Sequence, residues 1–421
     1  MAMGAVDTLM VGHVSAQVLA AVALGNLYCF SIIIFSMGTL MSLDPIVAQA
    51  IGAGDNTAVA RAMQRGFILA LGLSVFSALL MAPASQALTL FRQSPEIIPD
   101  ASRFIRISIA GVVPYLAFVV FRQSLQAMHR VAPIVWTILV ANVVNALLNW
   151  VFVYGHLGSP PRGAAGSAIA TVISRWLMAM MLLVVSWRTL RPHLLPIRAN
   201  VAQRDALVRM LRLGTPIGAQ QALEAGAFAA IGLLMGVLGT IEMAAHQIAI
   251  TLASLTFMVP LGVASAAAVR VGHAIGAGDE PRSRDAVRAA YICGIGFMML
   301  TAIVFLSVPS LLARAFTGDA RVIGLAAVLI PVAGVFQVFD GAQAVGAGVL
   351  RGAGDTTAPL IVMLAAYWLV GVPVSAYLGF RTDLRAVGLW WGFVVSLGAV
   401  AVVLCARILF VFRRGIRRVV I

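Results

Sequence analysis

The sequence predicts an all-α polytopic membrane protein of about twelve transmembrane helices, arranged as two six-helix lobes related by a parallel pseudo-two-fold repeat. Hydrophobic residues make up 61% of the 421 positions and charged residues only 10%, whereas soluble domains carry about 25% charged residues. The apolar runs repeatedly reach the roughly 20 residues that a helix needs to cross a bilayer. They do not alternate, as the strands of a membrane barrel would. A six-residue phrase, Ala-Ile-Gly-Ala-Gly-Asp, occurs at 50–55 and again at 274–279.

The expected spans follow the apolar runs along the chain. In the first half, helices are expected at 1–12, 18–50, 66–90, 101–125, 131–154 and 165–186. In the second half, they are expected at 216–238, 243–269, 289–312, 322–350, 359–378 and 386–412. The first helix is expected to be truncated, because no basic flank and no full span precede its polar residues. The predicted domains are an N-terminal lobe (1–186), a cytoplasmic linker (187–213), a C-terminal lobe (214–412) and a basic cytoplasmic tail (413–421).

The basic residues predict the orientation of the chain. All 29 are arginines, the formal net charge is +14, and most of them fall in short loops between apolar runs. An excess of basic residues is typical of cytoplasmic loops. We therefore expect a multi-pass protein of the inner membrane with both termini in the cytoplasm. A nucleic-acid partner is not expected, because a basic binding patch would have to lie on a soluble face.

No catalytic constellation or cofactor motif is found in the sequence. The chain has no lysine, and hence no Walker A motif for ATP hydrolysis. The two Gly-Ala-Gly-Asp phrases do not follow a strand in a βαβ unit, so they do not predict a dinucleotide site. We expect neither an enzyme nor a bound cofactor.

Further echoes support an internal duplication. Val47 and Val271 are separated by 224 residues, the same offset as the two copies of the repeated phrase. Gly166 and Gly388 form a similar match at an offset of 222. Six expected spans separate the copies, and an even number of crossings preserves direction. The repeat is therefore parallel, with its axis along the membrane normal.

Four acidic residues lie within expected spans, where a charged side chain costs about 2.5–3.5 kcal/mol on insertion scales. They are Asp7, Asp44, Glu224 and Asp340. Glu224 and Asp340 both belong to the second half, and they favour a site for a proton or for Na⁺ held by carboxylate and amide oxygens. An inert pair with Arg175, the only base expected to be buried, is the alternative.

The roles of the other two acids stay open at this level. Asp7 is either a helix cap or a protonatable site. Asp44 precedes a proline, and it either satisfies freed backbone groups near the headgroups or takes part in transport. Asn142, Asn145 and Asn149 lie on one helix face, which predicts interhelical hydrogen bonds, a polar lining beside Asp7, or both.

Three motifs carry a resemblance to a known family. They are Val6-Asp7-Thr8 with Gly12, Val47-Ala48-Gln49-Ala50 with the phrase that follows it, and Leu350–Asp355 with Pro359. Together they resemble the multidrug and toxic compound extrusion (MATE) family, near its NorM-like branch. The resemblance implies a two-lobed transporter that exports organic, often cationic compounds in exchange for Na⁺ or H⁺.

The resemblance also implies roles for individual residues. Asp7 matches the family's helix 1 acid, implicated in proton coupling and drug release, and Asn145 and Asn149 match polar positions near it. Glu224 and Asp340 match an acidic pair implicated in cation binding. Phe336 and Gln337 lie about one turn before Asp340, and Phe336 stands where some sodium-coupled members carry tyrosine.

The sequence therefore predicts a secondary antiporter that works by alternating access. Its expected partners are small organic cations or other amphipathic molecules, Na⁺ or H⁺, and membrane lipids, and a monomer is expected. The alternatives are a lipid-precursor flippase of related fold and a non-transporting membrane scaffold or receptor.

Overall fold

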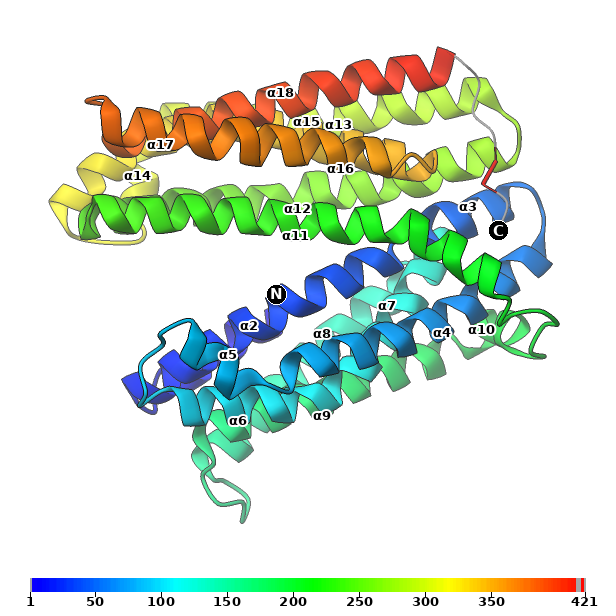
Figure 1. Ribbon diagram of the computed structural model, residues 1–421, viewed down its shortest axis with the longest axis horizontal. Coiled ribbons are helices and arrows are strands. Elements are labelled where there is room, and N and C mark those ends of the chain that lie inside the picture. The colour runs from blue at the N-terminus through cyan, green and yellow to red at the C-terminus, as the bar shows by residue number, and fades with distance from the viewer. Residues whose placement is uncertain (1, 414–417, 420–421) are drawn as a thin grey trace. The chain divides into compact units, whose positions relative to one another are not determined.

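The computed structural model describes residues 2–413, 418 and 419, and these residues form helices without any β-strand (Figure 1). The first helices are α1 (Ala2–Val11), α2 (Ala16–Leu40), α3 (Leu43–Gly52), α4 (Asn56–Met81), α5 (Ala84–Leu90), α6 (Ile98–Ser108), η1 (Ile109–Gly111), α7 (Val112–Ala127), α8 (Ala132–Tyr154), α9 (Gly163–Val185) and α10 (Trp187–Leu194). They are followed by α11 (Arg204–Leu238), α12 (Thr240–Gly276), α13 (Glu280–Ser307), α14 (Pro309–Arg314), α15 (Ala320–Gly352), α16 (Thr357–Met363), η2 (Leu364–Gly371), α17 (Val372–Arg381) and α18 (Arg385–Arg413).

The predicted all-α membrane fold is confirmed. Within the described part of the chain, 11 helical segments are long and apolar enough to cross a membrane. The ten-residue α1 is too short to be counted among them. Most of the predicted basic tail, residues 414–417, 420 and 421, lies outside the described residues.

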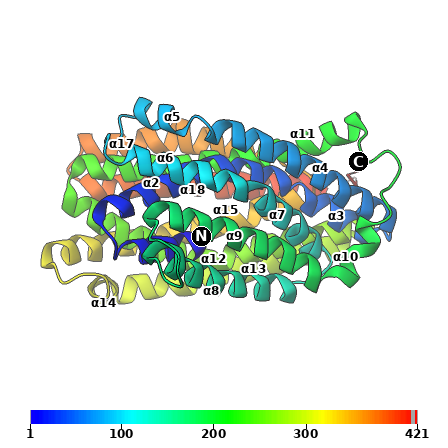
Figure 2. The same ribbon diagram turned by 90° about the horizontal axis from the view of Figure 1, so that it is seen from below.

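The chain divides into two compact units. Unit 1 holds Met1–Leu43 and Asp55–Gly218, and unit 2 holds Asp44–Gly54 and Ala219–Val420. In unit 1, α9 packs against α6, α7 and α8, and its helices run lengthwise beside one another in both views (Figures 1 and 2). In unit 2, α15 packs against α12, α13 and α18.

Several helices differ from the expected spans. The expected helix at 18–50 is interrupted at Met41–Ser42, which separates α2 from α3. The expected linker is partly helical, since α10 lies within it and α11 begins at Arg204. This segment is docked on α4, where the Gln64 side chain donates to the His193 carbonyl at 3.1 Å and accepts from the Arg198 amide at 2.9 Å.

The repeated phrase is a helix-to-helix turn. Gly54 and Gly278 both have a φ of +70°, a left-handed conformation that glycine adopts without strain and that commonly ends helices. The aspartate that follows each glycine caps the next helix. Asp55 accepts from the Ala58 amide at 2.8 Å, and Asp279 accepts from the Arg282 amide at 2.9 Å.

The helical ends that precede the two turns also lie directly against each other within unit 2. A Cβ added to Gly52 would meet the carbonyl of His273, and one added to Gly276 would meet the carbonyl of Gln49. These are corresponding positions in the two copies, so the contact is reciprocal. The repeated glycines are therefore needed for close approach of α3 to α12.

A substitution at this contact is expected to be destabilising. In Gly276→Ala the new Cβ meets backbone atoms, which cannot rotate away as a side chain can. We therefore expect the free energy of unfolding to fall by about 1–3 kcal/mol, together with the unfolding temperature in detergent. Gly296→Ala is the matched control in a helix of the same unit, because its Cβ would meet nothing within 4 Å. A Gly276→Ala protein as stable as that control would contradict the close packing.

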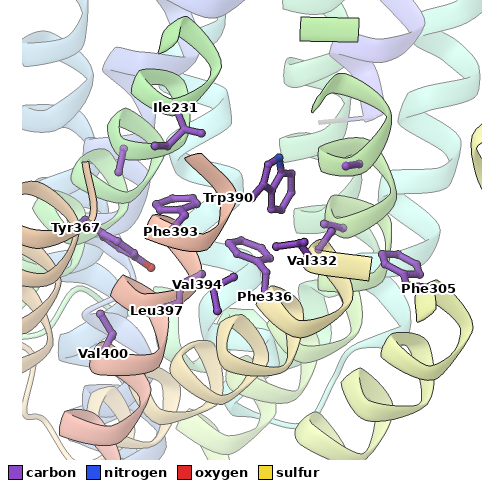
Figure 3. Close-up of a cluster of buried hydrophobic side chains, with 14 of the residues drawn as sticks. Ile231, Phe305, Val332, Phe336, Tyr367, Trp390, Phe393, Val394, Leu397 and Val400 are labelled. Carbon is purple, nitrogen blue, oxygen red and sulfur yellow. The ribbon is translucent and has the colours of Figure 1, made fainter. Parts of the chain in front are cut away.

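An aromatic cluster fills the core of unit 2 around Phe336 of α15 (Figure 3). The ring centroid of Phe336 lies 5.3 Å from that of Trp390 and 5.6 Å from that of Phe393, both on α18. Phe228 of α11 approaches Phe393 edge-on at 4.8 Å. The cluster fixes α11, α15 and α18 around the segment that carries Asp340.

Candidate ion-binding sites

Asp7 lies in the middle of α1 and is fully buried in unit 1. Its carboxylate accepts from the Asn149 amide of α8 at 2.8 Å and from the Thr171 hydroxyl of α9 at 2.7 Å. Asn145 extends this network, since its amide donates to the Thr171 hydroxyl at 3.4 Å. Asp7 is therefore bound to two other helices, and the capping interpretation is wrong.

The rest of the predicted polar stripe and Arg175 lie around this network. Asn142 donates its amide to the carbonyl of Ile138 in its own helix at 2.7 Å. Arg175 follows Thr171 by one turn of α9, and its guanidinium carbon lies 5.1 Å from the centre of the Tyr115 ring. This cation–π contact accounts for the position of Arg175 within the bundle.

Glu224 and Asp340 are joined by a single amide in unit 2. The Gln343 side-chain nitrogen donates to Glu224 Oε1 at 2.9 Å and to Asp340 Oδ1 at 3.3 Å. Asp340 is buried and Glu224 is partly exposed. Asp340 and Gln343 are three residues apart on α15, so they share a helix face, and α11 brings Glu224 to that face.

Phe336 and Gln337 have different surroundings from the acidic pair. Phe336 belongs to the aromatic cluster. Gln337 accepts from the Thr256 hydroxyl at 2.7 Å and donates to the Thr301 hydroxyl at 2.9 Å, which ties α15 to α12 and α13. Its amide is thus used in helix packing.

Asp44 has a strong partner that the sequence reasoning missed. Its carboxylate lies 3.5 Å from the guanidinium of Arg351, with side-chain exposures of 1% and 9%. The expectation that Arg175 is the only buried base is therefore wrong. Asp44 forms a buried ion pair within unit 2.

Beside this pair, Gln49 joins three segments of the same unit. Its side-chain nitrogen donates to the carbonyl of Gly352 at 2.9 Å, and its side-chain oxygen accepts from the amide of Val419 at 2.7 Å. The end of α3, the end of α15 and the described part of the tail meet here.

The two carboxylate networks are suited to bind a proton or a hard cation. Among the described residues, no ion pair is formed by Asp7, Glu224 or Asp340. The described residues also contain no group of three His, Cys, Asp or Glu side chains that could hold a metal ion. Oxygen-rich sites with one or two carboxylates favour hard cations over transition metals.

Sequence reasoning missed Thr171, Gln343 and Arg351. Gln343 lies three residues after Asp340, so helix periodicity could have placed it on the same face as that acid. Thr171 has no such spacing to a candidate acid in its own helix, so the sequence offered no signal for it. The expected helix at 322–350 ends just before Arg351, so the apolar run gives no sign that this arginine is helical and buried. The structure continues α15 through this arginine to Gly352.

Comparisons with known proteins agree with this architecture. The family model described as MatE matches residues 1–151 and 216–377. The chain is 36% identical to "Probable multidrug resistance protein NorM" of Rhizobium meliloti (strain 1021), covering 98% of this chain and 90% of that protein. It is 33% identical to "Multidrug resistance protein MdtK" of Pectobacterium atrosepticum, covering 99% and 93%.

Solved structures share the fold. The crystal structure of the eukaryotic MATE transporter AtDTX14 superposes with a TM-score of 0.87 at 22% identity, covering 98% of this chain and 93% of that one. An outward-facing multidrug resistance MATE transporter of the MOP superfamily superposes with a TM-score of 0.86 at 20% identity, covering 98% and 94%.

The sequence motifs, the helical architecture and these comparisons lead to one assignment, and the predicted resemblance is confirmed. The proteins concerned are membrane transporters and not enzymes. The chain is a multi-pass membrane protein that belongs to the MatE family of multidrug and toxic compound extrusion transporters.

Proposed function

We propose that this protein is a secondary antiporter of the inner membrane that exports small organic cations and related amphipathic compounds in exchange for Na⁺ or H⁺. The arginine-rich loops and both termini would face the cytoplasm, and the protein would act as a monomer without a cofactor. Relatives named as multidrug resistance proteins support the substrate class.

The acidic pair of unit 2 carries this proposal. Glu224 and Asp340 share one amide donor and form no ion pair, so a bound cation or proton would relieve the repulsion between two nearby carboxylates. Asp7 supplies a second protonatable group in unit 1, and its three polar neighbours hold the carboxylate in place.

Coupling then requires that the cation and the drug favour different conformations. A ligand shifts a conformational equilibrium only by its differential affinity for the two states. Loading the carboxylates with Na⁺ or H⁺ would stabilise the conformation that releases drug, and emptying them would stabilise the one that binds it.

The test is transport by the purified protein in liposomes loaded with ethidium. An imposed Na⁺ or H⁺ gradient opposite to the dye should accelerate ethidium movement, and collapsing that gradient should stop the acceleration. Equal dye movement with and without either gradient would contradict the antiport. Gradient-independent movement of a fluorescent lipid precursor would instead support the flippase.

A further inference from the structure

A cavity of about 250 Å³ lies between the start of α13 and the end of α18 in unit 2. Both helices are long and apolar enough to cross a membrane, and both pack against α15. About one turn deeper in the bundle, the Cys405 thiol donates to the Tyr291 hydroxyl at 3.3 Å and joins the two helices. The cavity therefore lies at one end of two membrane helices, at the level of the lipid headgroups.

The lining of this cavity has a basic part and an apolar part. The basic part consists of Arg284, Arg288 and Arg413, and no acid is found among the described residues that line the cavity. The apolar part consists of Val287, Ile408, Leu409 and Phe412. Leu409 is 62% exposed, so the apolar part reaches the outer surface of the bundle. A ligand with an anionic head and an apolar chain matches both parts.

Two of the arginines, one from each helix, are available to an anion. Arg413 forms no ion pair with any described residue. Arg288 lies 3.8 Å from Asp285, but these side chains are 77% and 74% exposed, and exposed ion pairs contribute little. Arg284 is already hydrogen-bonded to Glu280 at 3.4 Å. Because guanidinium groups match the oxygens of a phosphate, Arg288 and Arg413 are suited to bind one between them.

A second cavity of about 100 Å³ adjoins the first, because Arg284 and Phe412 line both. Ser283 lines this second cavity, is 2% exposed, and has a hydroxyl without a hydrogen-bond partner in the described structure. The acids that line it, Asp279 and Glu280, are already bonded to α13 itself. A buried hydroxyl without a partner is unfavourable, and a polar headgroup that extends from the first cavity accounts for it.

We propose that the two cavities bind one anionic phospholipid, whose phosphate lies between Arg288 and Arg413. An acyl chain follows Leu409 and the other apolar residues of α18 into the membrane, and a hydroxyl-bearing headgroup such as glycerol reaches Ser283. Basic pockets between membrane helices bind anionic headgroups. A zwitterionic lipid is a poorer match, because its ammonium group cancels the charge that the arginines attract. The inference concerns a lipid and not the coupling ion, so it does not rest on the proposed antiport.

The probe is dioleoylphosphatidylglycerol, titrated into the purified full chain in detergent, with bound lipid counted by native mass spectrometry. One molecule is expected to bind about tenfold more tightly than dioleoylphosphatidylcholine or dioleoylphosphatidylethanolamine. In Arg288→Gln/Arg413→Gln the Kd for phosphatidylglycerol should rise about tenfold, because both arginines that bind the phosphate are lost. Arg270→Gln/Arg282→Gln is the matched control, since these exposed arginines of the same unit line neither cavity. The control should leave the Kd nearly unchanged.

Three results would overturn the lipid site. They are equal affinity of the unsubstituted protein for the three lipids, an unchanged Kd in Arg288→Gln/Arg413→Gln, and an equal loss in the control, which would show that surface charge alone attracts the lipid. Glycerol 3-phosphate carries the phosphate without acyl chains and should not displace the lipid. Its displacement of the lipid would instead assign the cavities to a soluble phosphate compound. The unfolding temperature without added lipid checks that each variant is folded.

Discussion

Replacement of Asp340 by asparagine is expected to reduce cation-driven dye efflux at least tenfold, and Glu224→Gln is expected to do the same. Both substitutions keep the size of the side chain and remove its charge. Each carboxylate is a proposed ligand of the coupling cation, and the hydrogen bond it accepts from Gln343 is of the charged kind that contributes about 1.5–3 kcal/mol. Each 1.4 kcal/mol corresponds to a factor of ten. Initial rates of ethidium efflux in liposomes with an imposed gradient measure the effect.

Glu280→Gln is the matched control for these variants, because its carboxylate is 63% exposed on α13 of the same unit. It should retain the wild-type rate. Gradient-driven efflux that is unchanged in Asp340→Asn and Glu224→Gln would show that coupling does not depend on this pair.

The second large effect is expected at the buried ion pair of Asp44 and Arg351. Removing one member of a buried ion pair costs about 3–5 kcal/mol, because the remaining buried charge loses its opposite neighbour. Asp44→Asn and Arg351→Met should therefore each lower the thermal unfolding temperature in detergent strongly. The double variant should be more stable than the sum of the two single losses predicts, since it removes both charges of the pair together.

A double-mutant cycle measures this coupling. The pair Arg284–Glu280, with side chains 55% and 63% exposed, provides the comparison, and its removal should change stability little, because exposed pairs contribute little. Additive losses at Asp44 and Arg351 would show that the two side chains do not stabilise each other.

The fold was largely predictable because lipid imposes a simple pattern on the sequence. Long apolar runs specify membrane helices, and the repeated phrase specifies a turn with a left-handed glycine and a capping aspartate. The first and last residues of the helices were harder to predict. α11, α12 and α13 extend beyond their apolar runs into arginine-bearing sequence, where hydropathy gives no signal and packing decides.

The site was predictable only for residues that are costly in a membrane. The charges of Asp7, Glu224 and Asp340 marked them as candidates, and the structure gives each of them polar neighbours. Gln343 and Thr171 carry no charge, so their part in the two networks depends on which helix face lies opposite them. Arg351 was missed because its partner, Asp44, lies 307 positions away in the chain.

In the proposed mechanism, cation and drug compete because each favours a different conformation of the protein. The most direct test is calorimetric titration of the purified protein with tetraphenylphosphonium at low and high Na⁺ and at two pH values. Because coupling between ligands is reciprocal, the affinity should fall at least fivefold when Na⁺ or H⁺ is raised, and this change should vanish in Asp7→Asn/Asp340→Asn. Equal affinity under every condition would contradict the account.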